Sequence, residues 1–350
     1  MTPAVQTRPG VDRRIRLAGE LVVISALVVG ASAVLLVIGG ADPYEAYSQL
    51  VDGAFGTRRA VGETLIRFAP LAIIAVGLTP SLRAGLFNIG APGQIAAGAL
   101  AATMVSLHLD ALPTALLLVT AAISAAAAGA AWGLIPALLK ARLSVNEILS
   151  TLVFNFLAFG LMSYLLTGPL QPETANIAQS EPLPDQTFIP LLLSDTRAHI
   201  GVLLALAAVA ALAYYQATPA GYRLSLYSHS PSLAAQSGAS PRRLIVTTMC
   251  LGAAAAGLAG WMQVAGVDHR LYATVAGPIG YTGLFVALLG GLRPLGILVA
   301  SFFFAALLTG GESLQVGAGV SPEIIDALIG LILLAVAAHT GFRMRARLTR

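Results

Sequence analysis

Long apolar runs recur along almost the whole chain and are separated by short polar connections. Most of them approach the roughly 20 residues that a helix needs to cross the hydrocarbon core of a bilayer. Only 10% of the residues are charged, against roughly 25% in a soluble domain, so a water-exposed surface cannot be built from them. Backbone polar groups must be satisfied internally in lipid, and the alternating pattern of a barrel is missing, so we expect an all-α integral membrane protein.

The runs predict about ten transmembrane helices in one domain, residues 17–340, between tails at residues 1–16 and 341–350. The first run follows Arg13, Arg14 and Arg16 without a convincing cleavage site, and we interpret it as a retained signal-anchor helix. Residues 281–292 are short and glycine-rich, which is typical of a half-helix or a broken, re-entrant span. The expected spans are residues 17–39, 61–80, 90–107, 112–139, 146–167, 199–216, 244–266, 281–292, 294–311 and 322–340.

The basic residues predict the orientation, because cytoplasmic loops near span ends retain Lys and Arg. With ten crossings both termini lie on one side, and fifteen of the twenty Lys and Arg residues lie on that side. We therefore expect both termini to be cytoplasmic. The five on the other side are Arg58, Arg59, Arg67, Arg197 and Arg270.

Two connections are longer than a simple link requires. Residues 168–198, on the outside, contain five prolines, which oppose continuous helix and favour an ordered but irregular segment. Residues 218–243, on the inside, contain Ser230 and Pro231 followed by Gly238. Serine as N-cap, proline at the first helical position and glycine as the stop predict a short helix lying outside the membrane.

The sequence contains no signature of catalysis or nucleotide binding. The phosphate-loop pattern is missing, as are the common zinc-protease and serine-nucleophile patterns, and the single cysteine, Cys250, has no metal-binding partners in the sequence. We therefore expect a chain that is not an enzyme and binds no metal or cofactor itself. The carboxylates lie near span ends rather than at mid-membrane, which argues against proton coupling and against a strongly charged substrate.

Neutral polar residues, by contrast, do lie within the expected spans. Glu147, Thr151 and Asn155 are spaced four apart and so share one helix face. Asn155 falls near the middle of its span, where an amide needs a partner; it could join helices or line a solute path, and we leave both possibilities open.

A second polar segment interrupts two apolar runs at residues 85–94 (GLFNIGAPGQ). Its three glycines and one proline predict a break, which is tolerated at membrane depth only against protein or a water-lined cavity. Asn88 and Gln94 supply donors and acceptors suited to hydroxyls or base edges, and Phe87 supplies a stacking face. Residues 277–283, followed by Gly290 and Gly291, give the second half of the chain a matching break, although an ordinary loop is the alternative there.

Small residues elsewhere are spaced for close helix packing. The patterns Gly129-x-x-x-Gly133 and Ala253-x-x-x-Gly257 let backbones approach one another. We expect these residues to pack helices together rather than to contact a solute.

Four segments of this chain resemble a known family. They are residues 85–98 (GLFNIGAPGQIAAG), 145–156 (VNEILSTLVFNF), 230–260 and 280–307. They look like the permease subunits of bacterial ABC importers for simple sugars, nucleosides and branched-chain amino acids, and most closely like the nucleoside-uptake branch. Pro92 stands where many relatives carry a glutamate.

The resemblance implies the partners and the roles of the residues. It implies an ABC ATPase subunit that holds ATP and Mg, a second permease subunit that is a paralogue, and an extracytoplasmic substrate-binding lipoprotein of the basic-membrane-protein type, with no nucleic acid among the partners. The inner helix would be the coupling helix that contacts the ATPase. Phe87, Asn88, Gln94, Thr151 and Asn155 would lie along the solute path. The coupling residues would be Ser230, Pro231, Leu233, Ala234 and Gly238.

The expected function is therefore nucleoside import across the bacterial cytoplasmic membrane, driven by ATP hydrolysed on a partner chain. A permease for a simple sugar of the ribose or galactose type, or for a branched-chain amino acid, is the first alternative. A stand-alone secondary transporter or channel is the second.

Overall fold

The computed structural model describes residues 26, 29–230, 236, 238 and 240–331. Within these residues the chain is helical, and no strand forms beyond two isolated antiparallel bridges, Gln179 with Tyr272 and Leu191 with His199. The predicted all-α class is thus confirmed. Five of the described helices are long and apolar enough to cross a membrane, or six if the bent pair α7 and α8 counts as one span. The chain is a multi-pass membrane protein.

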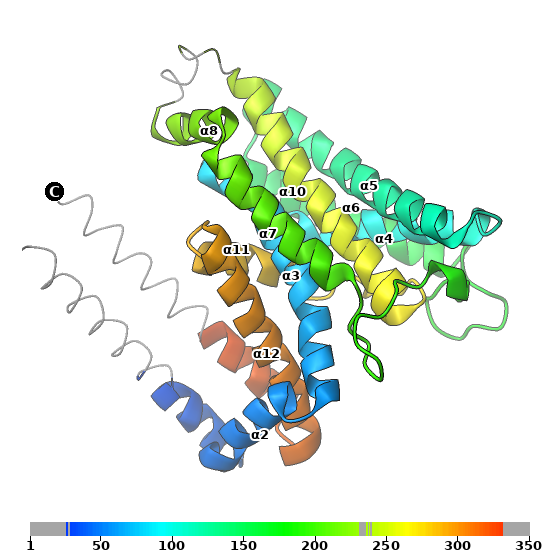
Figure 1. The fold of residues 1–350 in the computed structure, drawn as a ribbon, viewed down its shortest axis with the longest axis vertical. Helices are drawn as coiled ribbons and strands as arrows, with labels where there is room; N and C mark the ends of the chain where they lie inside the picture. The colour runs from blue at the N-terminus through cyan, green and yellow to red at the C-terminus, as the bar shows by residue number, and fades with distance from the viewer. Residues whose placement is uncertain (1–25, 27–28, 231–235, 237, 239, 332–350) are drawn as a thin grey trace, which may run out of the picture. The chain divides into compact units, whose positions relative to one another are not determined.

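The helix bounds follow the expected spans closely between residues 58 and 318. Each of the eight interior spans predicted from the sequence falls on one helix, whereas the first and last extend beyond the described residues. Figure 1 labels α2 (Pro43–Phe55), α3 (Arg58–Arg83), α4 (Ala91–His108), α5 (Thr114–Leu143), α6 (Glu147–Leu166), α7 (Gly201–Ala217), α8 (Pro219–His229), α10 (Pro241–Gln263), α11 (Ile279–Leu289) and α12 (Pro294–Ala318).

The chain forms two compact units. One consists of residues 54–309, and the other combines the residues up to 53 with those from 310 onward. In the second unit, a short apolar helix, Val29–Ile38, and most of α2 pack with residues near the end of the described chain. Its buried core consists of Leu36, Ala46, Leu314, Val320, Ile325 and Leu328.

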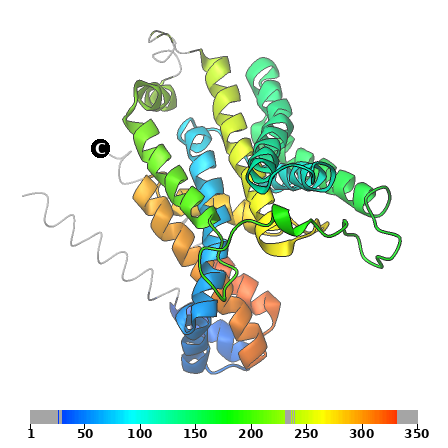
Figure 2. The ribbon, with the colours of Figure 1, turned by 45° about the vertical axis from the view of Figure 1, so that its right-hand side comes forward.

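Helix α10 is the central element of the unit formed by residues 54–309, where it packs against α3, α4 and α5. Figures 1 and 2 both show α10 running beside α5. The contacts are backbone to backbone: a Cβ on Gly257 would lie 2.2 Å from the Ala125 carbonyl oxygen, and one on Gly129 would lie 2.4 Å from that of Ala253. The two small-residue patterns pack helices together, as predicted, and the structure shows that they do so against each other. Lipid supplies no hydrophobic driving force between helices, so close packing must supply the attraction.

The outer segment, residues 168–200, is irregular but ordered, as its prolines predicted. In space it lies beside the end of α10, where Val264–Asp268 form a π-helix. Backbone amides of the segment donate to this stretch, from Leu183 to His269 and from Ile189 to Ala265, at 2.9 and 3.0 Å. Arg197 closes the segment with two hydrogen bonds to the carboxylate of Glu63 on α3, at 2.8 and 2.5 Å.

His199, one of the last residues of this outer segment, is fully buried. Its Nδ1 accepts from the Gly201 amide at 3.1 Å, and its ring fills the space beside Gly201 and Gly266. Burial, aided by repulsion from His269 when both rings are protonated, lowers the pKa of His199 to about 4. The ring is therefore neutral at neutral pH.

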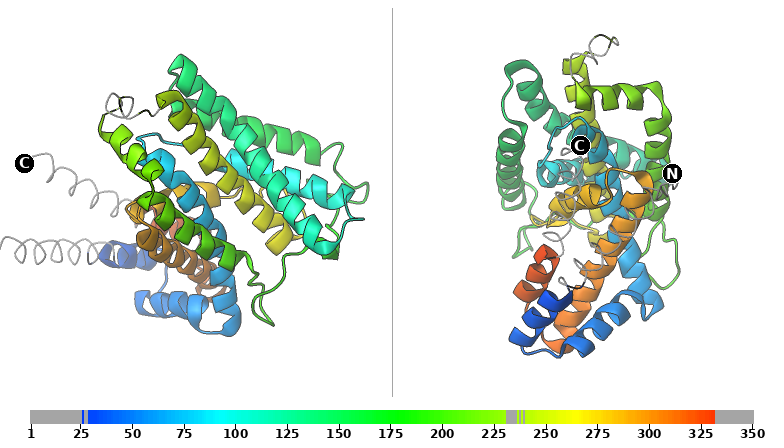
Figure 3. Two further views of the ribbon diagram at one scale, coloured as in Figure 1. Left: turned by 45° about the horizontal axis from the view of Figure 1, so that its top comes forward. Right: turned by 90° about the vertical axis from the view of Figure 1, so that its left-hand side faces the viewer.

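The inner connection carries a helix that the sequence reading missed. After α7, Pro219 starts α8 with Thr218 as N-cap, its hydroxyl accepting from the Gly221 amide. The chain bends by 74° between the two helices, and Figure 3 shows α8 turned away from α7. Ser230 ends α8 in an extended conformation and Gly238 has a positive φ of 81°. The coupling helix expected between them, with Pro231, Leu233 and Ala234, lies outside the described residues.

Candidate functional site

A break in the helical backbone separates α3 from α4, as the sequence predicted. Helix α3 ends at Arg83, Gly85 turns the chain with a φ of 75°, and residues 86–90 are not helical. Helix α4 then begins at Ala91, with Pro92 in its first turn, where no amide donor is needed. The break leaves backbone amides and carbonyls that other groups must satisfy.

One face of α6 satisfies them at successive points. Thr151 Oγ1 accepts from the Ile89 amide at 3.3 Å, and Asn155 Nδ2 donates to the Ile89 carbonyl at 3.0 Å. Asn155 Oδ1 accepts from the Gly93 amide at 2.9 Å. The Glu147 carboxylate lies next to the Phe87 backbone amide. Glu147, Thr151 and Asn155 thus form a ladder along α6 that holds the backbone of residues 87–93, and we call it the α6 ladder.

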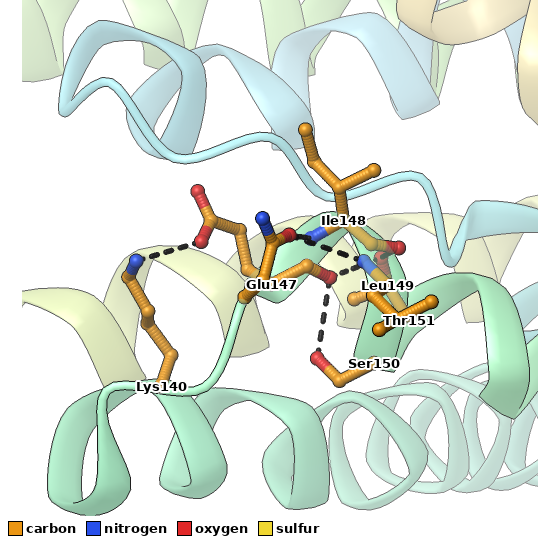
Figure 4. Close-up of polar contacts among 7 residues, drawn as sticks. Lys140, Glu147, Ile148, Leu149, Ser150 and Thr151 are labelled. Carbon is orange, nitrogen blue, oxygen red and sulfur yellow. Dashed lines mark hydrogen bonds and ion pairs between the residues drawn. The ribbon is translucent and has the colours of Figure 1, made fainter.

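An ion pair and a helix cap hold the first residue of the α6 ladder, Glu147, in place. Lys140, near the end of α5, forms an ion pair of 2.8 Å with Glu147 (Figure 4). Asn146 is the N-cap of α6 and its side chain accepts from the amides of Ile148 and Leu149. Sequence reasoning missed Lys140, although its position seven residues before Glu147, across the tight α5–α6 turn, could have indicated the pair.

Asn88 and Gln94 form the second part of the site. Their amides bond to each other twice, at 3.2 and 3.1 Å, and Asn88 Oδ1 also accepts from the Gly90 amide at 2.9 Å. Glycines surround this pair, because a Cβ on Gly90 would lie 2.9 Å from Gln94 Nε2 and one on Gly133 would lie 3.2 Å from it. The amide pair therefore stabilises the turn into α4.

The five predicted path residues separate into two kinds. Asn88, Gln94, Thr151 and Asn155 form one buried network, each at most 1% exposed. Their polar atoms bond to the backbone of the break or to one another. Phe87 lies at the edge of this network, with 41% of its surface exposed. The geometry makes the four buried residues the framework of the break and Phe87 its exposed part.

The second predicted break lies against the first. Helix α11 has 11 residues, a length of about 16 Å, well short of the roughly 30 Å hydrocarbon core, as expected of a half-helix. Gly280, in its first turn, faces Pro92, and a Cβ there would lie 2.7 Å from the Pro92 nitrogen and 2.8 Å from its ring carbons. Gly280 thus gives the proline ring its space.

Comparisons with known proteins agree with this arrangement. Residues 60–337 match the family model "Branched-chain amino acid transport system / permease component". The chain is 35% identical to a glucose ABC transporter permease protein of Haloferax volcanii, over 92% of this chain and 87% of the relative. It is 34% identical to a guanosine ABC transporter permease protein of Bacillus subtilis, over 94% and 96%.

A nucleoside ABC transporter permease protein of Lactococcus lactis is 28% identical over 91% of this chain and 90% of its own length. No solved structure matches the chain. The family model covers most of the sequence, including both breaks and the α6 ladder. The chain belongs to the branched-chain amino acid transport system permease family.

Proposed function

We propose that this chain is the membrane-spanning permease subunit of an ABC importer that carries a nucleoside into the cell. The observation that carries the proposal is the 34% identity, over almost the full length of both chains, to a permease named for guanosine transport. The absence of charged side chains among the proposed path residues, Phe87, Asn88, Gln94, Thr151 and Asn155, supports it, because an uncharged solute does not need a compensating charge.

In this proposal Phe87, Asn88, Gln94, Thr151 and Asn155 lie along the solute path. Phe87 offers a ring face on which a base can stack, since its side chain is partly exposed. The four buried side chains keep the break in place behind it. The path therefore holds the solute weakly, as a permease must, and alternating access moves it between the two sides.

We place the chain in the cytoplasmic membrane with about ten crossings and both termini inside. The support is the excess of Lys and Arg on that side. Helices α3, α4, α5, α6, α7, α10 and α12, together with the half-helix α11, correspond to eight of the ten expected spans, and the apolar runs at the two ends of the chain correspond to the others.

The partners follow from this role. An ATPase subunit holds ATP and Mg and contacts the inner connection at Ser230, Pro231, Leu233, Ala234 and Gly238. A paralogous permease pairs with this chain in the membrane, and an extracytoplasmic lipoprotein delivers the solute to the outer segment. Membrane lipid covers the apolar faces that remain, such as that of α6 with Leu149 and Phe156 exposed.

A simple sugar is the second candidate solute, because the glucose permease relative is 35% identical. A branched-chain amino acid fits the family description. Its zwitterion, however, would need charged or helix-end groups.

Transport in proteoliposomes tests the proposal. The complex of this chain with its ATPase, second permease and binding protein should accumulate labelled guanosine when ATP is supplied on the ATPase side, and excess glucose should not compete. Accumulation of labelled glucose but not of labelled guanosine would support the sugar function. Uptake driven by an ion gradient without the ATPase would contradict the ABC mechanism.

A further inference from the structure

The meeting point of the two breaks carries one more polar side chain. Tyr281 follows Gly280, whose backbone packs against Pro92, so it lies where the first turn of α11 adjoins the first turn of α4. Its hydroxyl lies 3.4 Å from Asn155 Nδ2. Tyr281 is therefore a residue of the second half of the chain that contacts the α6 ladder.

The bond to Asn155 is weak and leaves the Tyr281 hydroxyl available. Asn155 Nδ2, which also donates to the Ile89 carbonyl at 3.0 Å, is the donor in this contact, so the Tyr281 hydroxyl accepts and its own proton is not used. At 3.4 Å the contact with Tyr281 is longer than a typical N–H···O bond. Among the described residues we find no acceptor for the phenolic proton of Tyr281.

Exposure separates Tyr281 from the framework residues. Asn88, Gln94, Thr151 and Asn155 are buried, whereas Tyr281 is partly exposed. A phenol can donate one hydrogen bond and accept another, and its ring offers an apolar face. Tyr281 thus combines a free donor with access from outside the network.

We propose that Tyr281 is a specificity-determining residue of the permease, whose hydroxyl donates to an acceptor on the base of the nucleoside, a carbonyl oxygen or a ring nitrogen. This inference rests on the nucleoside function proposed above. A site that donates to a substrate acceptor discriminates against solutes that place a donor or an apolar group there, because the donor of the site is then left unpaired.

The test compares initial uptake rates of guanosine, adenosine and uridine by the reconstituted complex carrying wild type or Tyr281→Phe. Loss of one neutral hydrogen bond in the path should change the ratios of these rates by about 3- to 10-fold. Tyr214→Phe on α7 is the matched control, because Tyr214 is 76% exposed, and its ratios should equal those of wild type.

The outcomes are distinguishable. If wild type carries no nucleoside, the proposed function fails. If wild type carries nucleosides and Tyr281→Phe lowers all three rates by the same factor, or changes none, Tyr281 is a packing residue and this inference is overturned. Tyr281→Met also removes the hydroxyl but fills the space differently. It carries the same expectation if the Phe variant does not accumulate in the membrane.

Discussion

Thr151 is the middle residue of the α6 ladder, and its hydroxyl accepts from the Ile89 amide while donating to the Glu147 carbonyl. Thr151→Val keeps the shape of the side chain but removes the acceptor, and an unpaired buried amide costs about 1–3 kcal/mol. We expect a lower thermal unfolding midpoint in detergent and slower uptake. Thr151→Ser retains the oxygen and should behave like wild type. Equal unfolding midpoints for the two variants would show that the hydroxyl does not hold the break.

The pKa of His199 predicts a pH dependence of stability. The pKa is about 4 in the folded chain, where burial disfavours the charged ring, and 6.5 when the ring is free. The unfolded chain therefore binds more protons between these values. The contribution of His199 to the free energy of unfolding is complete above about pH 6.5 and falls as the pH drops toward 4. The unfolding midpoint should decrease from pH 7 to pH 5.

His199→Gln provides the comparison for this pH dependence. Glutamine does not titrate, so the decrease in unfolding midpoint between pH 7 and pH 5 should be smaller than in wild type. Other groups also titrate in this range, and only the difference between the two proteins reports on His199. An identical decrease in both would contradict its assignment as a buried neutral ring.

At the residue scale, spacing alone predicted that the three residues of the α6 ladder share one face of a helix. Glu147, Thr151 and Asn155 were placed on one helix face because they are four residues apart, and the structure confirms that face. Their partners were not predictable, since Ile89 and Gly93 are bonded through backbone atoms about which the sequence carries no information. The contact of Tyr281 with Asn155 joins residues 126 apart in the chain, beyond the reach of any local pattern.

At the scale of elements, the close approach of α10 to α5 gives a further prediction. A Cβ on Gly257 would collide with the Ala125 carbonyl oxygen. Gly257→Leu should therefore separate the helices and lower the amount of folded protein in the membrane and its unfolding midpoint in detergent. Gly160→Leu on α6 is the control, because no atom lies within 4 Å of the position where a Cβ would be added. Equal loss for both variants would count against backbone contact as the cause.

Helices outside the apolar spans were harder to predict than the spans. A polar residue followed by proline marks the start of α8, with Thr218 and Pro219, just as it was expected to mark a helix at Ser230 and Pro231. The same signal begins α2 at Asp42 and Pro43, where the Asp42 side chain accepts from the Glu45 amide. The predicted spans rest on the length of apolar runs, and neither of these helices is long enough to span a membrane.

At the scale of the whole molecule, transport requires that motion pass from the ATPase to the path. Ala234 lies in the expected coupling helix, and Ala234→Glu should place a bulky charge against the ATPase and abolish ATP-driven uptake. The binding protein should still bind its solute with unchanged affinity. Ala234→Ser, a small change at the same position, should retain uptake. Normal uptake by Ala234→Glu would remove this segment from the coupling interface.

Composition predicted the membrane class of the whole chain, because so few charges cannot cover a soluble surface. It did not predict how the outer segment is held. That segment contacts two helices that are far apart in the sequence, α10 through backbone bonds to its end and α3 through the Arg197–Glu63 pair, whose members are 134 residues apart. Such contacts depend on the folded arrangement and leave no periodic pattern in the sequence.

The α6 ladder bonds to the backbone of the break and not to its side chains, so the side chains of the break can vary without loss of these bonds. Thr151 and Asn155 bond to backbone amide and carbonyl groups of Ile89 and Gly93. The backbone of the break therefore keeps the same conformation whatever side chain occupies position 87. Selection, or a protein engineer, can then replace Phe87 to suit a different solute while inheriting the scaffold intact. One framework could in this way serve many cargoes.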